Sequence, residues 1–125
     1  LRINVEDILY SMKSLMWRHM GVQRDAELLR EANEKIAFWC RVVQQLAPYE
    51  PRAFELQNML LVSRLATVGA LARQESRGVH YRTDFPKMRE EWRRHTVSVP
   101  VRDGERLEGA QLLAEAPLTA APVIG

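Results

Sequence analysis

The chain has 125 residues, of which 46% are hydrophobic and 27% charged, and its formal net charge is +2. These values fit one soluble globular domain and are too balanced for a dedicated nucleic-acid-binding protein. No apolar run approaches the roughly 20 residues that a membrane-spanning helix needs, and the N-terminus lacks the layout of a signal peptide. The single cysteine, Cys40, excludes an internal disulfide, fits a reducing cytoplasm and falls among apolar helix positions, which indicates a buried, unreactive thiol.

The first predicted element is a helix over residues 5–20. Its apolar side chains recur at helical spacing on one face, made of Ile8, Met12, Leu15 and Met16. Asn4 is placed to cap the start, with Asp7 three residues on, and Gly21 is expected to supply the left-handed residue that ends the helix. The chain begins at Leu1, close to this helix and without a methionine, so we expect a piece of a longer protein.

A second helix is predicted over residues 26–46, because no helix breaker follows the candidate cap Asp25 until Pro48. Pro51 can begin the third helix, which is predicted over residues 52–74. The apolar face of the second helix is expected to contain Leu29, Ile36, Trp39, Cys40, Val43 and Leu46. The third helix has a main stripe of Phe54, Leu61, Leu65, Val68 and Leu71, with Leu60, Val62 and Ala72 beside it. Small residues that would allow another backbone to approach are Ala66, Gly69, Ala70 and Ala72.

Three long amphipathic helices joined by short links predict an all-α fold, an up-and-down three-helix bundle similar to a spectrin repeat. After residue 74 the helical pattern stops. A loop is expected between Gly78 and Pro86, followed by one or two further helical turns within residues 87–95.

The C-terminal part has a different pattern. Residues 96–109 alternate in the manner of a strand, and Asp103-Gly104 is a signal for a tight hairpin turn. We therefore divide the chain into the bundle with its loop and short helix, residues 1–96, and a small β-hairpin with a loosely ordered tail, residues 97–125.

Three motifs that would indicate a cofactor or metal site are missing: a glycine-rich phosphate loop, a CxxC pair and a His-x-x-x-His helix. A nucleotide or flavin therefore has no evident binding loop in this chain. His19, His80 and His95 are too scattered to indicate a metal site. Ser76 and His80, four residues apart, could be imagined as a nucleophile and its base, but hydrogen bonds to nearby backbone are the favoured interpretation.

The segment "ESRGVHYRTDFP", residues 75–86, concentrates charged side chains. Arg77 and Arg82 flank a bend, and each can bind a carboxylate or a row of backbone carbonyls through two donors. Glu75 and Asp84 are their candidate partners. Two interpretations stay open: an internal set of ion pairs that closes the end of the third helix, or a surface presented to a second domain or to an anionic ligand.

A local positive surplus suggests another hypothesis, a free-standing helical module that binds an acidic partner or nucleic acid through residues 73–94. Trp92 is followed by two arginines, and such side chains can stack on bases and contact phosphates. The two glutamates that precede Trp92 weaken this hypothesis. An anchoring contact between Trp92 and the bundle is favoured.

Three segments, in one order, resemble a known family: "MWRHMGVQRD" at 16–25, "ELQNMLLVSRLATVGALARQESRGVHYRTDFP" at 55–86, and "EWRRHT" at 91–96. They are similar to the C-terminal helical domain of the succinate dehydrogenase and fumarate reductase flavoproteins, and most of all to the L-aspartate oxidase branch. The resemblance covers residues 1–96. Gln23 departs from the apolar residue usual at its place, and the hairpin and tail lie outside the resemblance.

The resemblance implies a flavoenzyme whose FAD and substrate are bound upstream, in a Rossmann-like flavin domain and a capping domain, so no catalytic or cofactor-binding residue is expected here. This part would be structural and would dock on those domains of the same polypeptide. In the L-aspartate oxidase branch the whole enzyme oxidises L-aspartate to iminoaspartate, for quinolinate and NAD synthesis. The alternative parent is a succinate dehydrogenase or fumarate reductase flavoprotein.

For the isolated chain the resemblance implies no activity, no flavin of its own and no nucleic-acid partner. An exposed docking face would make it self-associate. The resemblance also implies that the charged loop lies at the interface with the absent flavin domain. The candidate interdomain or structural residues are Arg24, Glu75, Ser76, Arg77, Gly78, His80, Arg82 and Asp84.

Overall fold

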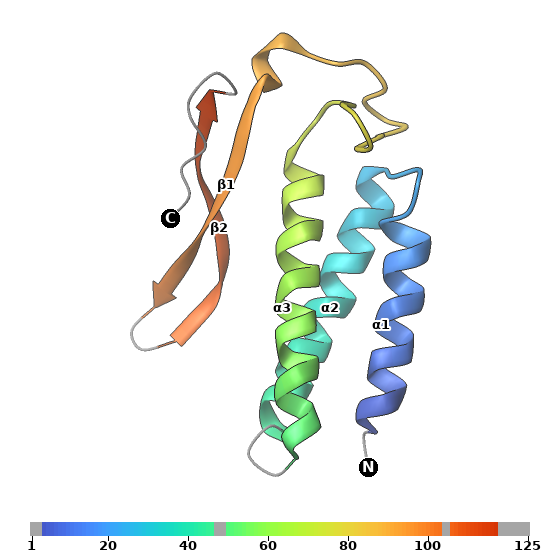
Figure 1. Cartoon of the computed structure of the whole chain (residues 1–125), viewed down its shortest axis with the longest axis vertical. Helices are drawn as coiled ribbons and strands as arrows, with labels where there is room; N and C mark the ends of the chain where they lie inside the picture. The colour runs from blue at the N-terminus through green and yellow to red at the C-terminus, as the bar shows by residue number, and fades with distance from the viewer. Residues whose placement is uncertain (1–3, 47–49, 104–105, 118–125) are drawn as a thin grey trace.

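The chain is a three-helix bundle with a two-stranded extension. The computed structural model describes the backbone of residues 4–46, 50–103 and 106–117, and the side chains of residues 4–45 and 50–97. The elements are α1 (Val5–His19), α2 (Ala26–Leu46), α3 (Pro51–Ala72), a 3-10 helix η2 (Glu90–Trp92), β1 (Arg94–Asp103) and β2 (Arg106–Pro117). The helices run up, down and up, as the sequence predicts (Figure 1). Of the described helices, none is long and apolar enough to cross a membrane.

Local signals explain where the helices begin. The Asn4 Oδ1 atom accepts a hydrogen bond from the Glu6 amide at 2.9 Å, and Asp25 Oδ1 accepts one from the Leu28 amide at 2.9 Å. Both side chains are therefore the N-caps that the sequence predicts, and each satisfies an amide that has no partner within its helix. Pro51 opens α3, where its missing N–H removes no helical hydrogen bond.

The expected role of Gly21 at the end of α1 is wrong. Among the described residues the positive φ belongs to Gly78, at +59°, and the C-cap of α1 is Met20. Gly21 is needed for a different reason, since a Cβ atom there would lie 2.4 Å from the carbonyl oxygen of Trp17. After α1 ends, the backbone at position 21 passes so close to the last turn of the helix that only a residue without a side chain fits.

The core lies between α1, α2 and the inner face of α3. The predicted faces of the first two helices are confirmed for the residues that are fully buried, namely Ile8, Met12, Leu15, Leu29, Ile36 and Val43. Met16, Trp39 and Cys40 pack partly buried against this cluster. The side chain of Leu46 lies outside the described residues.

The predicted main stripe of α3 does not match its buried face, although Leu60, which was predicted beside the stripe, is buried. The buried residues of α3 are Ala53, Leu56, Leu60, Ser63, Thr67 and Ala70. Phe54, Leu61 and Val62, which the sequence assigns to the apolar stripe or its border, are half or more exposed. The hydroxyl groups on the buried face are satisfied, because Thr67 donates to the Ser63 carbonyl at 2.7 Å. Small side chains on this face let α3 pack closely against α1, where Ser63 Oγ lies 3.7 Å from Met12 Sδ.

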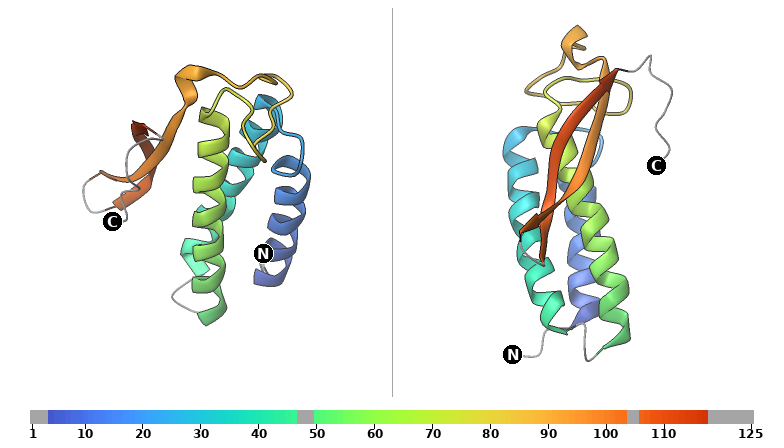
Figure 2. Two further views of the ribbon diagram at one scale, coloured as in Figure 1. Left: turned by 45° about the horizontal axis from the view of Figure 1, so that its top comes forward. Right: turned by 90° about the vertical axis from the view of Figure 1, so that its left-hand side faces the viewer.

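The C-terminal hairpin is longer than predicted. Strand β1 pairs antiparallel with β2, from Arg94 opposite Pro117 to Asp103 opposite Arg106, and lies on the side of α3 away from α1 (Figure 2). The second strand thus takes in residues 112–117, which were expected to be loose tail. Gly104 of the expected turn and tail residues 118–125 lie outside the described residues. The helical turns expected before the hairpin reduce to the single 3-10 turn η2.

Candidate functional site

The segment between α3 and β1 folds over one end of the bundle, where α1 ends, α2 begins and α3 ends (Figure 1). All eight candidate residues lie at this end. Arg24 comes from the α1–α2 link, and its backbone pairs with the loop: its amide donates to the Tyr81 carbonyl at 3.0 Å, and its carbonyl accepts from the Thr83 amide at 2.8 Å. The loop is therefore bonded to a segment far away in the sequence.

Arg82 closes the C-terminus of α3. Its side chain is 1% exposed, and its Nη1 atom donates to the carbonyls of Ala70 at 3.1 Å and Leu71 at 2.8 Å. These carbonyls belong to the last turn of the helix. There they have no amide partner within the helix, and the helix dipole places a partial negative charge. A guanidinium is well suited to this place because it combines a positive charge with several donors.

Asp84 links Arg82 to the start of α2. The carboxylate accepts from Arg82 Nε at 2.9 Å and Nη2 at 2.7 Å, and from the Ala26 amide at 3.1 Å. The hydrogen bonds from Arg82 are the main cause that lowers the pKa of Asp84 below its usual value. Arg82 and Asp84 together therefore hold the end of α3 against the beginning of α2.

Glu75 is the centre of a second cluster and is completely buried. Its carboxylate accepts hydrogen bonds from Arg73, from Arg77 Nε at 3.0 Å and from the Arg89 amide at 3.1 Å. Burial alone would raise the pKa of this carboxyl, but the three hydrogen bonds outweigh it and lower the pKa below its usual value. Glu75 is thus a buried anion fully surrounded by donors.

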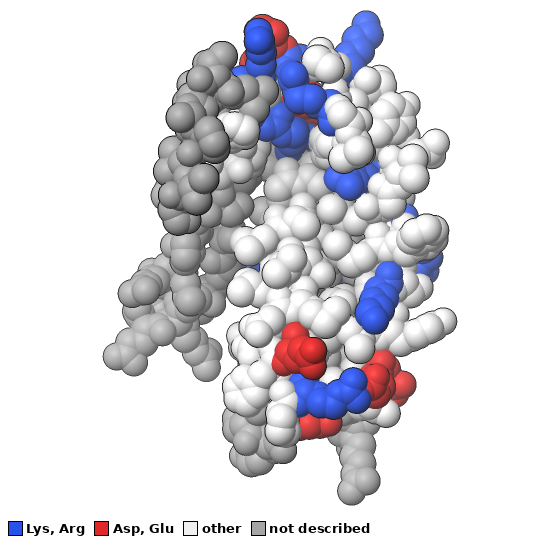
Figure 3. Space-filling model, in the orientation of Figure 1, with Lys and Arg blue, Asp and Glu red and all other residues white. Residues whose placement is uncertain are grey.

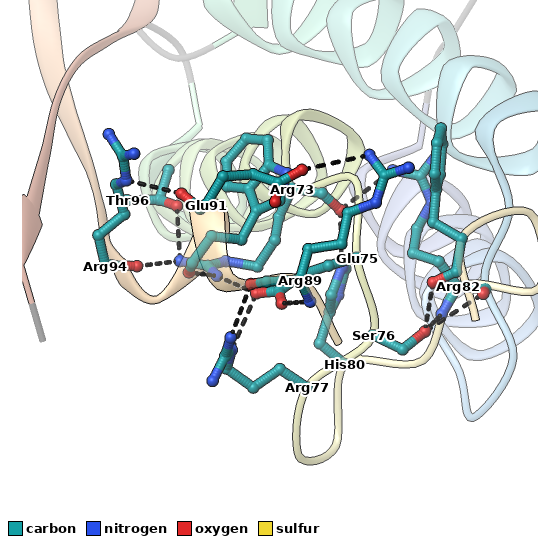
Figure 4. Close-up of polar contacts among 12 residues, drawn as sticks. Arg73, Glu75, Ser76, Arg77, His80, Arg82, Arg89, Glu91, Arg94 and Thr96 are labelled. Carbon is teal, nitrogen blue, oxygen red and sulfur yellow. Dashed lines mark hydrogen bonds and ion pairs between the residues drawn. The ribbon is translucent and has the colours of Figure 1, made fainter. Parts of the chain in front are cut away.

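Arg73 connects this cluster to the hairpin (Figure 4). Besides Glu75, its guanidinium donates to the carbonyls of Trp92, at 2.7 Å, and Arg94, and to Thr96 Oγ1 at 3.1 Å. It also lies 5.5 Å from the centre of the Trp92 ring, within the range of a cation–π contact. Trp92 is therefore anchored to the end of α3 through Arg73.

Ser76 bonds to backbone groups, and His80 contacts a backbone carbonyl and the Arg24 side chain. Ser76 Oγ accepts from the Arg82 amide at 2.9 Å and lies 2.8 Å from the Phe85 carbonyl, to which it can donate. His80 Nε2 lies 3.1 Å from the Arg73 carbonyl, and its Nδ1 lies 3.1 Å from Arg24 Nη1. A carbonyl only accepts and a guanidinium only donates, so His80 fits this place as the neutral tautomer with its proton on Nε2.

The surroundings of His80 favour that neutral form. Burial is the main cause that lowers the pKa of His80, and the positive charges of Arg24, Arg82 and Arg73 lower it further. The hydrogen bond to the Arg73 carbonyl acts in the opposite direction without reversing the shift.

Gly78 forms the turn at the tip of the loop. The amides and carbonyls of Arg77 and His80 exchange hydrogen bonds of 2.8 and 3.0 Å across it. The positive φ of Gly78 is a conformation that side chains disfavour, which explains the glycine. The turn leaves Val79 almost fully exposed.

Comparison with known proteins assigns the family. The profile of the family described as "Fumarate reductase flavoprotein C-term" matches residues 10–121, which is most of the chain. The chain belongs to this family. The match includes both strands of the hairpin, so the family pattern continues beyond residue 96, where the resemblance in the sequence was expected to end.

The relatives of this flavoprotein C-terminal domain are considerably longer proteins. An uncharacterised FAD-dependent oxidoreductase of Methanocaldococcus jannaschii is 36% identical over 99 residues, which are 76% of this chain and 18% of that protein. A CoM/CoB-type fumarate reductase polypeptide of Methanothermobacter marburgensis is 35% identical, over 74% of this chain and 18% of its own length. An L-aspartate oxidase of Synechocystis is 34% identical, over 66% of this chain and 19% of its own length. The chain therefore spans less than a fifth of these relatives.

The start of α2, beside the loop, does not fit the pyrophosphate of FAD. The pyrophosphate of a dinucleotide is usually bound by free amides at a helix N-terminus, but the amides of Ala26 and Leu28 at the start of α2 are occupied by Asp84 and Asp25. The arginines of the loop are likewise bonded to internal carboxylates and carbonyls. Within the described residues there is also no group of three or more side chains suited to a metal ion. Partial burial raises the pKa of Cys40, which disfavours a reactive thiolate.

An apolar groove lies beside the loop, between its tip and the end of α1. It has a volume of about 790 Å³ and is lined by Met12, Lys13, Met16, Trp17, Met20, Gly21, Val22, Arg24, Gly78, Val79 and Tyr81. We call it the α1 groove. Sequence reasoning missed it, although one signal was present: Trp17 is a large aromatic residue that lies off the apolar face of its helix.

Proposed function

We propose that this chain is the structural C-terminal domain of an FAD-dependent oxidoreductase and docks on the flavin and capping domains of the same polypeptide. One observation carries the proposal: every charged candidate residue is bonded to another group of this same chain. Glu75 and Asp84 each neutralise loop arginines, and Arg82 binds the end of α3. A loop whose candidate charged residues are all bonded internally is suited to hold helix ends together, not to bind a charged substrate.

FAD belongs elsewhere in this proposal. Because the amides at the start of α2 and the guanidinium groups of Arg73, Arg77 and Arg82 are bonded within the chain, we expect the upstream part of the enzyme to hold the flavin. When bound there, the flavin supplies the oxidation chemistry. The contribution of the present domain is to stabilise the enzyme that surrounds it.

We further propose L-aspartate as the substrate of the whole enzyme, which would be oxidised to iminoaspartate for quinolinate and NAD synthesis. Several relatives support this choice by name, including L-aspartate oxidases of Synechocystis, Nicotiana tabacum and Arabidopsis thaliana. A second candidate is a fumarate reductase or succinate dehydrogenase flavoprotein, which is favoured by the fumarate reductase polypeptide of M. marburgensis at similar identity.

The test uses the full-length enzyme purified without oxygen. L-Aspartate is expected to bleach the flavin absorbance, whereas succinate is not. Bleaching by succinate alone would favour the second candidate and contradict the first. A full-length protein with no flavin would contradict the proposed function as a whole.

A further inference from the structure

Large apolar side chains are exposed at the loop end, beside its charged groups. The candidate charged residues of the loop are bonded internally, and the apolar side chains around the α1 groove remain available to a partner. Trp17 is 83% exposed, Val22 86% and Val79 91%. Side chains of this size rarely stay in water together unless they form an interaction site. Figure 3 shows that most charged groups on the face in view lie towards the two ends of the bundle.

The groove has the composition of an adaptable protein-binding surface. Met16 and Met20, which are four residues apart on α1 and partly exposed, line it together with the buried Met12. Methionine side chains are flexible and polarisable, so they can adjust to the shape of an apolar partner. Trp17 adds a large aromatic surface of the kind that dominates the binding energy of protein interfaces.

The charge of the groove restricts the partner. Its lining includes Lys13 and Arg24 but no acidic residue. Arg24 already contacts His80 and the Gly21 carbonyl, whereas Lys13 is exposed. The groove therefore fits an apolar protein segment that carries an acidic group opposite Lys13.

We propose that the α1 groove is the surface through which this domain docks on the flavin-binding part of its own polypeptide. The inference rests on the proposed function and specifies which face makes the contact. The relatives are about five times longer than the matched segment, so a large part of each lies outside it and can supply the partner segment. A second copy is a poorer occupant, because a symmetric contact through this groove would bring cationic linings together.

The test uses the full-length holoenzyme and two measurements. First, the photoreactive residue p-benzoylphenylalanine replaces Val79 and, as a control, Val62 on the outer face of α3, which is 65% exposed. Irradiation is expected to cross-link position 79, and not position 62, to a peptide of the flavin-binding part within the same chain. Second, Trp17→Glu and Val79→Glu are expected to speed FAD release about tenfold, as the loss of one good interface anchor would. Val62→Glu should leave the rate unchanged.

Several outcomes would overturn the inference. A cross-link between two copies would make the groove a dimer interface instead. No cross-link above that of position 62, or equal FAD release from groove and control variants, would show that another face makes the contact. These failures differ from failure of the proposed function: an enzyme that holds FAD and oxidises L-aspartate would keep that function even if the groove variants behaved like the control. If the full-length protein held no flavin, the cross-linking result alone would test whether the α1 groove is the docking surface.

Discussion

Arg82 and Asp84 are two residues apart, yet they bind opposite ends of two different helices. The guanidinium donates to the last carbonyls of α3, and the carboxylate accepts from the Ala26 amide at the start of α2. Each charge faces the helix end of opposite polarity, and the two charges face each other. The pair thereby fixes the relative position of α2 and α3 at the loop end.

Arg82→Ala should destabilise the domain strongly. The change leaves the Ala70 and Leu71 carbonyls without their donor, whereas Asp84, whose side chain is 30% exposed, can be hydrated. Leaving buried backbone acceptors without a donor costs about 1–3 kcal/mol of the free energy of unfolding, measured by urea denaturation. The matched control is Arg93→Ala, which breaks an exposed pair with Glu90 and should cost less than about 1 kcal/mol. Equal losses in both variants would contradict the special role of Arg82.

Glu75→Gln should loosen the hairpin as well as the loop. The amide is isosteric with the carboxylate but carries no charge, so it holds Arg73 less firmly, and Arg73 is the residue that bonds the Trp92 and Arg94 carbonyls. Hydrogen exchange of the β1 amides near Arg94 is expected to speed up by about tenfold or more. Glu91→Gln, at an exposed carboxylate, is the control and should leave β1 exchange as it is. If β1 exchange were unchanged in both variants, the hairpin would not depend on the Glu75 cluster, and the prediction would be wrong.

Stability should fall as the pH is lowered from neutral, because of His80. Its pKa in the folded chain lies below the usual value of 6.5, so the unfolded state binds the proton first. Stability is therefore complete above pH 6.5 and declines towards the folded pKa, with a slope of up to about 1.4 kcal/mol per pH unit. His80→Gln keeps a donor and an acceptor but does not titrate, so its Tm should change less between pH 7.5 and 5.5. The exposed His95→Gln is the control and should retain the wild-type slope.

In the full-length enzyme, Arg77→Ala should affect flavin retention more than chemistry. Arg77 bonds Glu75 and the Arg89 carbonyl, and both contacts are inside this domain. We expect a lower Tm and a smaller fraction of bound FAD, with kcat per bound flavin within about twofold of the wild type. A variant with normal Tm and flavin content but a much lower kcat would place Arg77 at the active site instead.

Features that depend on neighbouring residues could be predicted from the sequence. Asn4 and Asp25 cap their helices through amides two and three residues on, and Pro51 opens α3. The pairs Glu75–Arg77 and Arg82–Asp84 join residues two apart, so a bend in the loop is enough to form them. Such contacts follow from short stretches of chain, whatever the rest of the molecule does.

The sequence alone thus determined the three helices, their order and the local ion pairs, whereas only the tertiary structure decided which surfaces meet. α3 carries apolar side chains on more than one side, so its periodicity could not choose a face. Packing chose the side of Ser63 and Thr67, because small side chains allow close contact with Met12 and Met16. The contact between Arg24 and His80, 56 residues apart, likewise exists only because the folded bundle brings the α1–α2 link beside the loop.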